Sequence, residues 1–128
     1  KDIDFLYIGR KRQGEAKEEY IVSKGFVKPT YSYWTIGYLI TREGAQKLLD
    51  SHPLEKLLPV DEFLPIMYNK HPCEEWKSYY PVRNLNALSV EPLLIQPMHY
   101  VGDELYVSDT EDSNLLSSEN QHPKHTDL

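Results

Sequence analysis

The chain has 128 residues, a formal net charge of −6 and a single cysteine. The acidic balance argues against a nucleic-acid-binding protein, and one cysteine excludes both an internal disulfide and a thiolate-rich zinc site. No apolar run approaches the roughly 20 residues that a membrane span needs. The length suits one small domain. Because a strand-like segment follows Lys1 almost at once, we expect a piece of a longer protein.

The first half of the sequence predicts a strand, a loop, a strand and a helix. Residues 3–8 (IDFLYI) form a short apolar run, which predicts a buried strand. Residues 10–28 are largely polar and predict a surface loop. A second strand is expected at 33–40. Thr41 then suits the N-cap of a short amphipathic helix over 42–50, whose apolar stripe would consist of Ala45, Leu48 and Leu49.

The second half predicts shorter helices and a last strand. A helix should begin near Asp61, with Pro65 close enough to its start for the missing N–H to cost little. A further helical turn is expected around Trp76. Residues 87–97 predict a strand that is interrupted at Pro92.

The fold class predicted from these elements is α/β. A strand, two helices and a strand with short connections form one half of such a domain, and a sheet of so few strands leaves open edges for the rest to cover. We expect this domain to occupy residues 1–108. Residues 109–128 hold five acidic residues and one lysine, a charge of −4 that leaves −2 for residues 1–108, and their composition predicts a disordered tail.

Two adjacent carboxylates, Asp61 and Glu62, lie among apolar residues in LPVDEFLP. One interpretation is structural: Asp61 would be the N-cap of the helix and gain from its free N–H groups and dipole. The other is chemical: one of the two carboxylates would be a general base. Apolar neighbours and an adjacent like charge would both raise the pKa of that base.

Other polar motifs have simpler interpretations. Asp2 and Asp4 form a D-x-D pair that could hold Mn²⁺ or Mg²⁺, but they precede a strand, whereas ligands gather at the carboxyl ends of strands. We therefore expect them to be solvated charges. His99, in PMHYVGD, is either a metal ligand or an ordinary histidine. The other four histidines have no evident partners, and YSYWTIGY (31–38) predicts a strand with a packed face.

Five sequence blocks resemble a known family. They are DFLYIGRKR, YSYWTIGYLITREGAQKLL, LPVDEFLPIMYNKHP, SVEPLLIQPMHYVGD and YVSDTE, in order over most of residues 4–112. Together they resemble the C-terminal region of the procollagen galactosyltransferases of glycosyltransferase family 25. The resemblance implies the C-terminal half of a GT-A type nucleotide-sugar domain. It also implies Mn²⁺-dependent, inverting transfer of galactose from UDP-galactose to 5-hydroxylysine of collagen, with the acidic metal-binding motif upstream and no activity in this piece alone.

The resemblance also implies roles for individual residues. Asp61 would be the general base, with Glu62 orienting or replacing it, and His99 would be a metal ligand in a His-x-x-Gly setting. The acceptor or sugar pocket would be lined by Tyr33 and Trp34, with Gly37 allowing close backbone approach. Three basic residues would either neutralise a diphosphate or be solvated loop charges: Arg10, Lys11 and Arg12.

The last residues, KHTDL, resemble retrieval signals of the KDEL type, although Thr126 and Asp127 depart from the usual letters. They favour the endoplasmic reticulum lumen and a retrieval receptor as partner. Two alternatives to an animal collagen galactosyltransferase stay open. One is a catalytically inactive family member that acts as a cell-adhesion or binding protein. The other is a bacterial relative that modifies lipooligosaccharide, although LPVDEFLP, SDTE and the KDEL-like end fit the animal group better.

Overall fold

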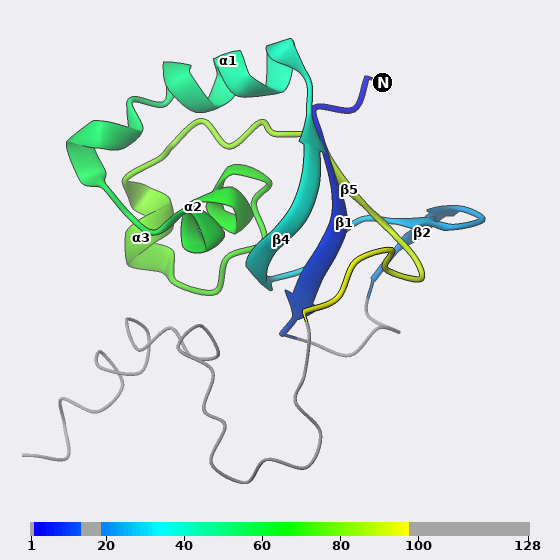
Figure 1. Ribbon diagram of the computed structural model, residues 1–128. Coiled ribbons are helices and arrows are strands. Elements are labelled where there is room, and N and C mark those ends of the chain that lie inside the picture. Colours follow the sequence, from blue (N-terminus) through cyan, green and yellow to red (C-terminus); the bar gives the residue numbers. More distant parts are fainter. Residues whose placement is uncertain (1, 14–18, 98–128) are drawn as a thin grey trace, which may run out of the picture. The chain divides into compact units, whose positions relative to one another are not determined.

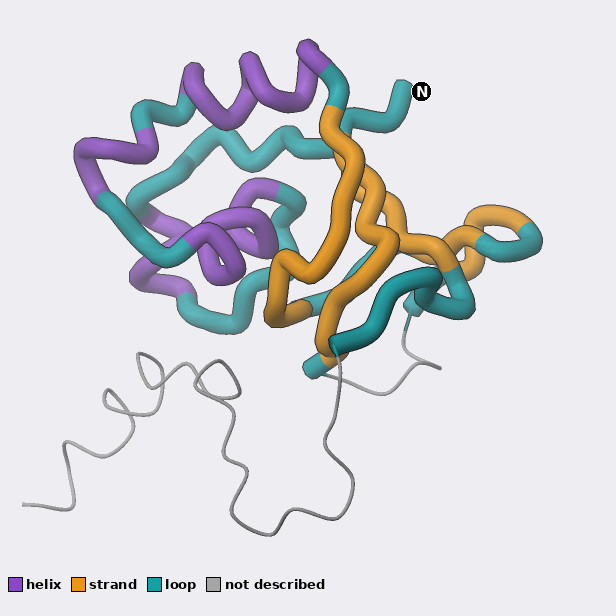
Figure 2. Tube along the Cα trace, in the orientation of Figure 1, coloured by secondary structure: helices purple, strands orange, loops and turns teal. Residues whose placement is uncertain are grey.

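The strands that the structure describes form one mixed sheet, in the order β2-β3-β5-β1-β4. A computed structural model describes residues 2–13 and 19–97. Helices lie beside β4, and the β2–β3 hairpin lies at the other edge of the sheet (Figures 1 and 2). The elements are β1 (Phe5–Arg12), β2 (Ile21–Ser23), β3 (Phe26–Val27), β4 (Ser32–Ile40), α1 (Arg42–Asp50), the 3-10 helix η2 (Pro53–Lys56), α2 (Val60–Met67), α3 (Glu74–Ser78) and β5 (Ala87–Val90).

The α/β class is confirmed, with helices and a single sheet. Strand β1 pairs antiparallel with β4 and parallel with β5, and β3 pairs antiparallel with β5. The predicted tail (109–128) and the domain boundary at 108 lie outside the described residues. Within those residues no helix is long and apolar enough to cross a membrane.

Strand β1 is longer than the sequence predicts. It continues through Arg12, and the β2–β3 hairpin occupies part of the segment 10–28. The prediction of a surface loop over that whole segment is therefore wrong. The physical reason is that the charged side chain of Arg10 is buried and paired, so its polarity does not mark a solvated loop.

Helix α1 is confirmed at the predicted residues, and Thr41 is its N-cap. The Thr41 hydroxyl accepts the N–H of Gly44 at 3.0 Å, which satisfies one of the free donors of the first turn. The predicted apolar stripe is only partly right, because Leu49 is 64% exposed. Gly44 is the buried residue of this helix, so the helix approaches the sheet through its smallest residue.

Helices α2 and α3 supply much of the core. Six consecutive α2 residues, 62–67, are buried, and the helix packs on β4. Strand β5 covers only Ala87–Val90 of the predicted 87–97, so the prediction of a strand that resumes after Pro92 is wrong. The Glu91–Pro92 peptide bond is cis. The apolar core consists of Phe5, Tyr7, Val27, Phe63, Leu64, Ile66, Met67, Tyr68, Trp76, Tyr80, Leu85, Ala87 and Leu88.

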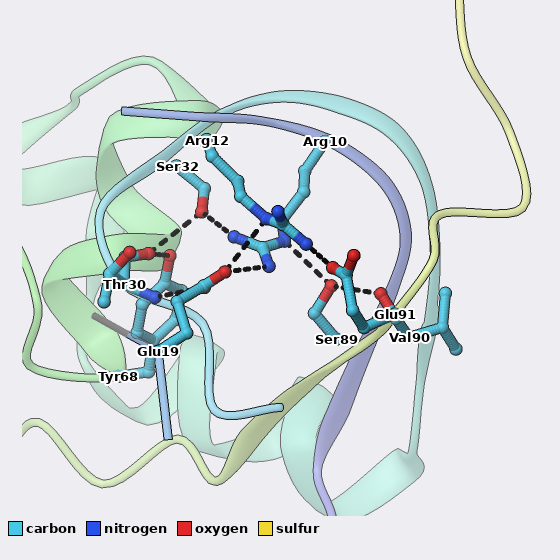
Figure 3. A network of polar contacts seen from close by, with 9 residues as sticks. All are labelled: Arg10, Arg12, Glu19, Thr30, Ser32, Tyr68, Ser89, Val90 and Glu91. Carbon is cyan, nitrogen blue, oxygen red and sulfur yellow. Dashed lines mark hydrogen bonds and ion pairs between the residues drawn. The ribbon is translucent and has the colours of Figure 1, made fainter. Parts of the chain in front are cut away.

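A buried polar network fastens β1 to its surroundings (Figure 3). The Arg10 guanidinium donates to Ser89 Oγ at 2.8 Å, to Ser32 Oγ at 2.9 Å and to Glu19 Oε1 at 2.9 Å. Arg12 pairs with Glu19 and with Glu91. Because these partners come from β4, β5 and the chain before β2, the network joins segments that are distant in sequence.

The first two aspartates differ in their surroundings. Asp2 is exposed, but Asp4 is buried. The Asp4 carboxylate accepts hydrogen bonds from Lys47 Nζ at 2.6 Å and from the N–H of Asn86 at 2.9 Å. The prediction that Asp4 is a solvated charge is therefore wrong, because it ties the start of β1 to α1 and to the residue before β5.

Candidate functional site

A bulge in β4 places Trp34 opposite the start of α2. Lys11 pairs with Tyr33 and Gly9 pairs with Gly37, so residues 34–36 face Arg10 alone across the two strands. Trp34 has φ 62°, a left-handed conformation that is uncommon for a bulky side chain. Bulges of this kind occur next to active sites, where they redirect side chains. The Lys11 ammonium lies 4.9 Å from the centroid of the Trp34 ring.

Asp61 lies in the first turn of α2, half-buried and next to this bulge. The helix begins at Val60 and the N-cap position belongs to Pro59, so the interpretation of Asp61 as the N-cap is wrong. Burial and the charge of Glu62 raise the pKa of Asp61 above its ordinary value, although hydrogen bonds from backbone N–H groups, including that of Trp34, oppose the rise. A half-exposed carboxylate with a raised pKa has the properties that a general base needs.

Glu62 has different surroundings from Asp61, because its side chain is completely buried. Its Oε2 atom accepts a hydrogen bond from the Tyr31 hydroxyl at 2.7 Å and lies 2.5 Å from His71 Nε2. Burial raises the pKa of Glu62, but hydrogen bonds from His71 and Tyr31 outweigh burial and lower it overall. Glu62 is therefore a buried carboxylate that stays ionised, out of reach of a bulky acceptor.

The site also contains His71, which sequence reasoning left without a partner. His71 lies in the turn after α2 and is buried against the Tyr31 ring, with ring centroids 4.8 Å apart. Glu62 and His71 are nine residues apart, and the chain reverses direction between them. Neither helical nor strand periodicity brings two residues at that spacing together, so the Glu62–His71 pair becomes visible only in the three-dimensional structure.

Four of the six predicted site residues come together where α2 packs on β4. They are Tyr33, Trp34, Asp61 and Glu62. Gly37 lies further along β4, where a Cβ would come 2.9 Å from Ile8 Cγ1 and 3.0 Å from Ile95 Cδ1. The close approach at Gly37 is therefore made by the protein's own side chains. His99 lies outside the described residues.

The basic residues of β1 are held within the protein. Arg10 is buried and carries three hydrogen bonds to protein groups, and Arg12 is paired with two glutamates. Lys11, over the Trp34 ring, is the member of the trio that lies next to the candidate site.

The described residues do not supply a metal site of their own. No group of three or more histidine, cysteine, aspartate or glutamate side chains among them could hold a metal ion. A divalent ion such as Mn²⁺ needs several oxygen ligands, so in this part of the chain the residues do not fit the metal.

Comparisons with known proteins place the chain among glycosyltransferase relatives. It is 56% identical over 120 residues to procollagen galactosyltransferase 1 of Danio rerio and 53% identical over 120 residues to procollagen galactosyltransferase 2 of Homo sapiens, matches that cover 92% of this chain. It is also 55% identical over 125 residues, 97% of this chain, to a glycosyltransferase 25 family member of Anopheles gambiae.

These matches confirm the resemblance to glycosyltransferase family 25. The matched region is 20% of the Danio and Anopheles proteins and 19% of the human one, so the chain spans about a fifth of these relatives' length. No family model and no solved structure matches the chain.

Proposed function

Because the chain is related to glycosyltransferase 25 family members over most of its length, we propose that it is the acceptor-side part of the catalytic domain of a procollagen galactosyltransferase. The domain would be of the GT-A type and would transfer galactose from UDP-galactose to 5-hydroxylysine of collagen. The observation that carries the proposal is Asp61, a half-buried carboxylate with a raised pKa, beside a strained tryptophan.

The surroundings of Asp61 suit a pocket that binds a sugar. An aromatic ring offers a flat apolar face to the C–H groups of a sugar, and Trp34 and Tyr33 lie on the strand against which α2 packs. The N–H of Trp34 bonds to Asp61, so the aromatic bulge and the carboxylate are held together. This placement supports Tyr33 and Trp34 as pocket residues.

The proposed reaction is a single inverting displacement. The hydroxylysine oxygen attacks C1 of galactose while Asp61 accepts its proton. The bond from C1 to the β-phosphate oxygen breaks, and UDP leaves with that electron pair. The products are an O-galactosyl hydroxylysine of inverted anomeric configuration, UDP and protonated Asp61. Glu62 is buried behind Asp61 and acts by orienting it.

Three further features belong to the proposed enzyme. It would require Mn²⁺, with its main acidic ligands upstream of Lys1 and His99 as an additional ligand. When bound, such an ion would neutralise charge on a diphosphate. The KHTDL end would direct the protein to the endoplasmic reticulum lumen through a retrieval receptor.

The test is a transfer assay on the full-length protein that contains this chain. Mn²⁺-dependent transfer from UDP-galactose to a hydroxylysine-containing collagen peptide is measured for wild type and for Asp61→Asn. If Asp61 is the base, kcat falls by about 10²–10⁴-fold. Asp50→Asn, at the exposed end of α1, is the matched control and keeps wild-type activity.

Two results would contradict the proposal. An Asp61→Asn variant with wild-type kcat would remove Asp61 from the chemistry. A well-folded wild type without transfer activity would favour the inactive, cell-adhesion type of family member instead.

A further inference from the structure

A cluster of three polar side chains, two of them fully buried and one partly buried, includes Glu62, the neighbour of Asp61. Glu62 comes from the first turn of α2, Tyr31 from the residue before β4, and His71 from the turn after α2. The side chains of Glu62 and His71 are fully buried. Burying polar groups is costly unless each has a partner. The cluster therefore needs hydrogen bonds that offset this cost, or a functional role that justifies it.

The hydrogen bonds of the cluster have a defined direction. The N–H of Cys73 donates to His71 Nδ1 at 3.0 Å, so the ring proton lies on Nε2 and points to Glu62. The Tyr31 hydroxyl donates to the same oxygen. Glu62 Oε2 thus accepts two hydrogen bonds, one from Tyr31 and one from His71. The rings of Tyr31 and Trp76 pack on the imidazole, with centroids 4.8 and 5.3 Å from it.

We propose that His71 is a positioning residue, which holds the Glu62 carboxylate ionised and in place and thereby fixes Asp61 for proton transfer. This inference rests on the proposed function, in which Asp61 is the base. Asp61 and Glu62 share one helical turn. Asp61 accepts a hydrogen bond from the N–H of Trp34, and Glu62 accepts one from the hydroxyl of Tyr31. The first turn of α2 is therefore held to both ends of residues 31–34.

After burial, the charge of Glu62 is the second cause of the raised pKa of Asp61. Besides Glu62, the titratable side chains that face the pair in the described part of the chain are Tyr7 of β1, Tyr31, Tyr33 of β4 and His71. Burial raises the pKa of all three tyrosines, so they are uncharged at neutral pH. The charge of Glu62 therefore remains to raise the pKa of Asp61.

The test is the pH profile of kcat/KM for galactosyl transfer by the full-length protein. In His71→Leu, Glu62 loses the hydrogen bond that most lowers its pKa, so its negative charge beside Asp61 is weakened in the acid range. The acid limb of the profile should then move to lower pH. Because Asp61 is less well positioned, kcat should fall by up to about 10²-fold. The KM for UDP-galactose should stay unchanged. His71→Gln keeps an N–H donor and retains the wild-type limb. His52→Asn, an exposed histidine beside η2, is the matched control.

A folded His71→Leu variant with wild-type kcat and a wild-type acid limb would overturn the inference. Should that variant not fold, Glu62→Gln replaces it: a shift of the acid limb to lower pH supports the inference, and an unshifted limb overturns it. Asp61→Asn is measured in the same series to separate the two hypotheses. An inactive Asp61→Asn beside normal His71 variants removes only the positioning role, whereas an active Asp61→Asn removes the proposed base as well.

Discussion

The Asp61 carboxylate occupies a helical turn where burial and the neighbouring Glu62 charge raise its pKa. The folded state therefore binds this proton more tightly than the unfolded state does. The resulting stability is fully present below the unfolded pKa and is lost as pH rises through the folded pKa. At neutral pH the ionised side chain lowers the free energy of unfolding, which is a common property of residues kept for activity.

This linkage predicts that Asp61→Asn raises the melting temperature of the full-length protein at neutral pH. Asparagine cannot ionise, but its side-chain oxygen still accepts the N–H of Trp34. The gain should shrink as pH falls through the raised pKa of Asp61, where the wild-type side chain takes up its proton. Thermal unfolding at several pH values checks this. A variant that melts lower than wild type at neutral pH, and equal to it at a pH acid enough to protonate Asp61, would show that the charge stabilises the helix.

At the residue scale, the sequence predicted the exposed part of the candidate site better than its buried part. Asp61 was predicted because a carboxylate is unusual among apolar residues, and Trp34 was predicted only from the family resemblance; the structure brings both to the contact between α2 and β4. His71 was missed because its partner Glu62 lies across a reversal of the chain. Pairing between such segments depends on tertiary packing, which local spacing does not encode.

Helix α1 shows how far local signals reach at the scale of elements. Its N-cap and both ends were predicted because the cap and the first turn lie within a few residues of each other. The side that packs inward was predicted less well, since Leu49 is exposed and Gly44 is buried. The contact is decided by the start of β1, which a helical pattern alone does not contain.

That contact predicts that Gly44→Ala destabilises the protein, although alanine favours a helix interior by about 1 kcal/mol. A Cβ at Gly44 would lie 2.5 Å from the carbonyl oxygen of Asp4. Asp4 cannot easily move away, because its backbone bonds to Thr41 and Asn86 at 2.9 Å. Overpacking of this kind costs roughly 1–3 kcal/mol, so the melting temperature of the full-length variant should fall.

The control for this prediction is Gln46→Ala, on the exposed side of the same helix. Its expected effect is within about 0.5 kcal/mol of wild type. A Gly44→Ala variant that is as stable as wild type would mean that α1 can move away from the sheet, and that helical propensity outweighs the close contact.

The buried network around Arg10 acts at the scale of the whole described fold (Figure 3). It explains why the predicted loop over residues 10–28 was wrong. A run such as Arg10, Lys11 and Arg12 is typical of a solvated surface, but the partners of Arg10 lie at positions 19, 32 and 89. Sequence alone shows the charges and not their pairing, so β1 was predicted to end too early.

The same geometry predicts that lysine cannot replace Arg10. The guanidinium reaches Ser32, Ser89 and Glu19 through three different nitrogens, whereas lysine has one ammonium group. Breaking a buried pair costs roughly 3–5 kcal/mol, and Arg10→Lys should approach the lower end because Arg12 still pairs with Glu19. Thermal unfolding of the full-length protein measures the loss, with exposed Arg42→Lys as control. Equal losses for the two variants would mean that the sheet is held by its apolar core and backbone pairing, and not by this network.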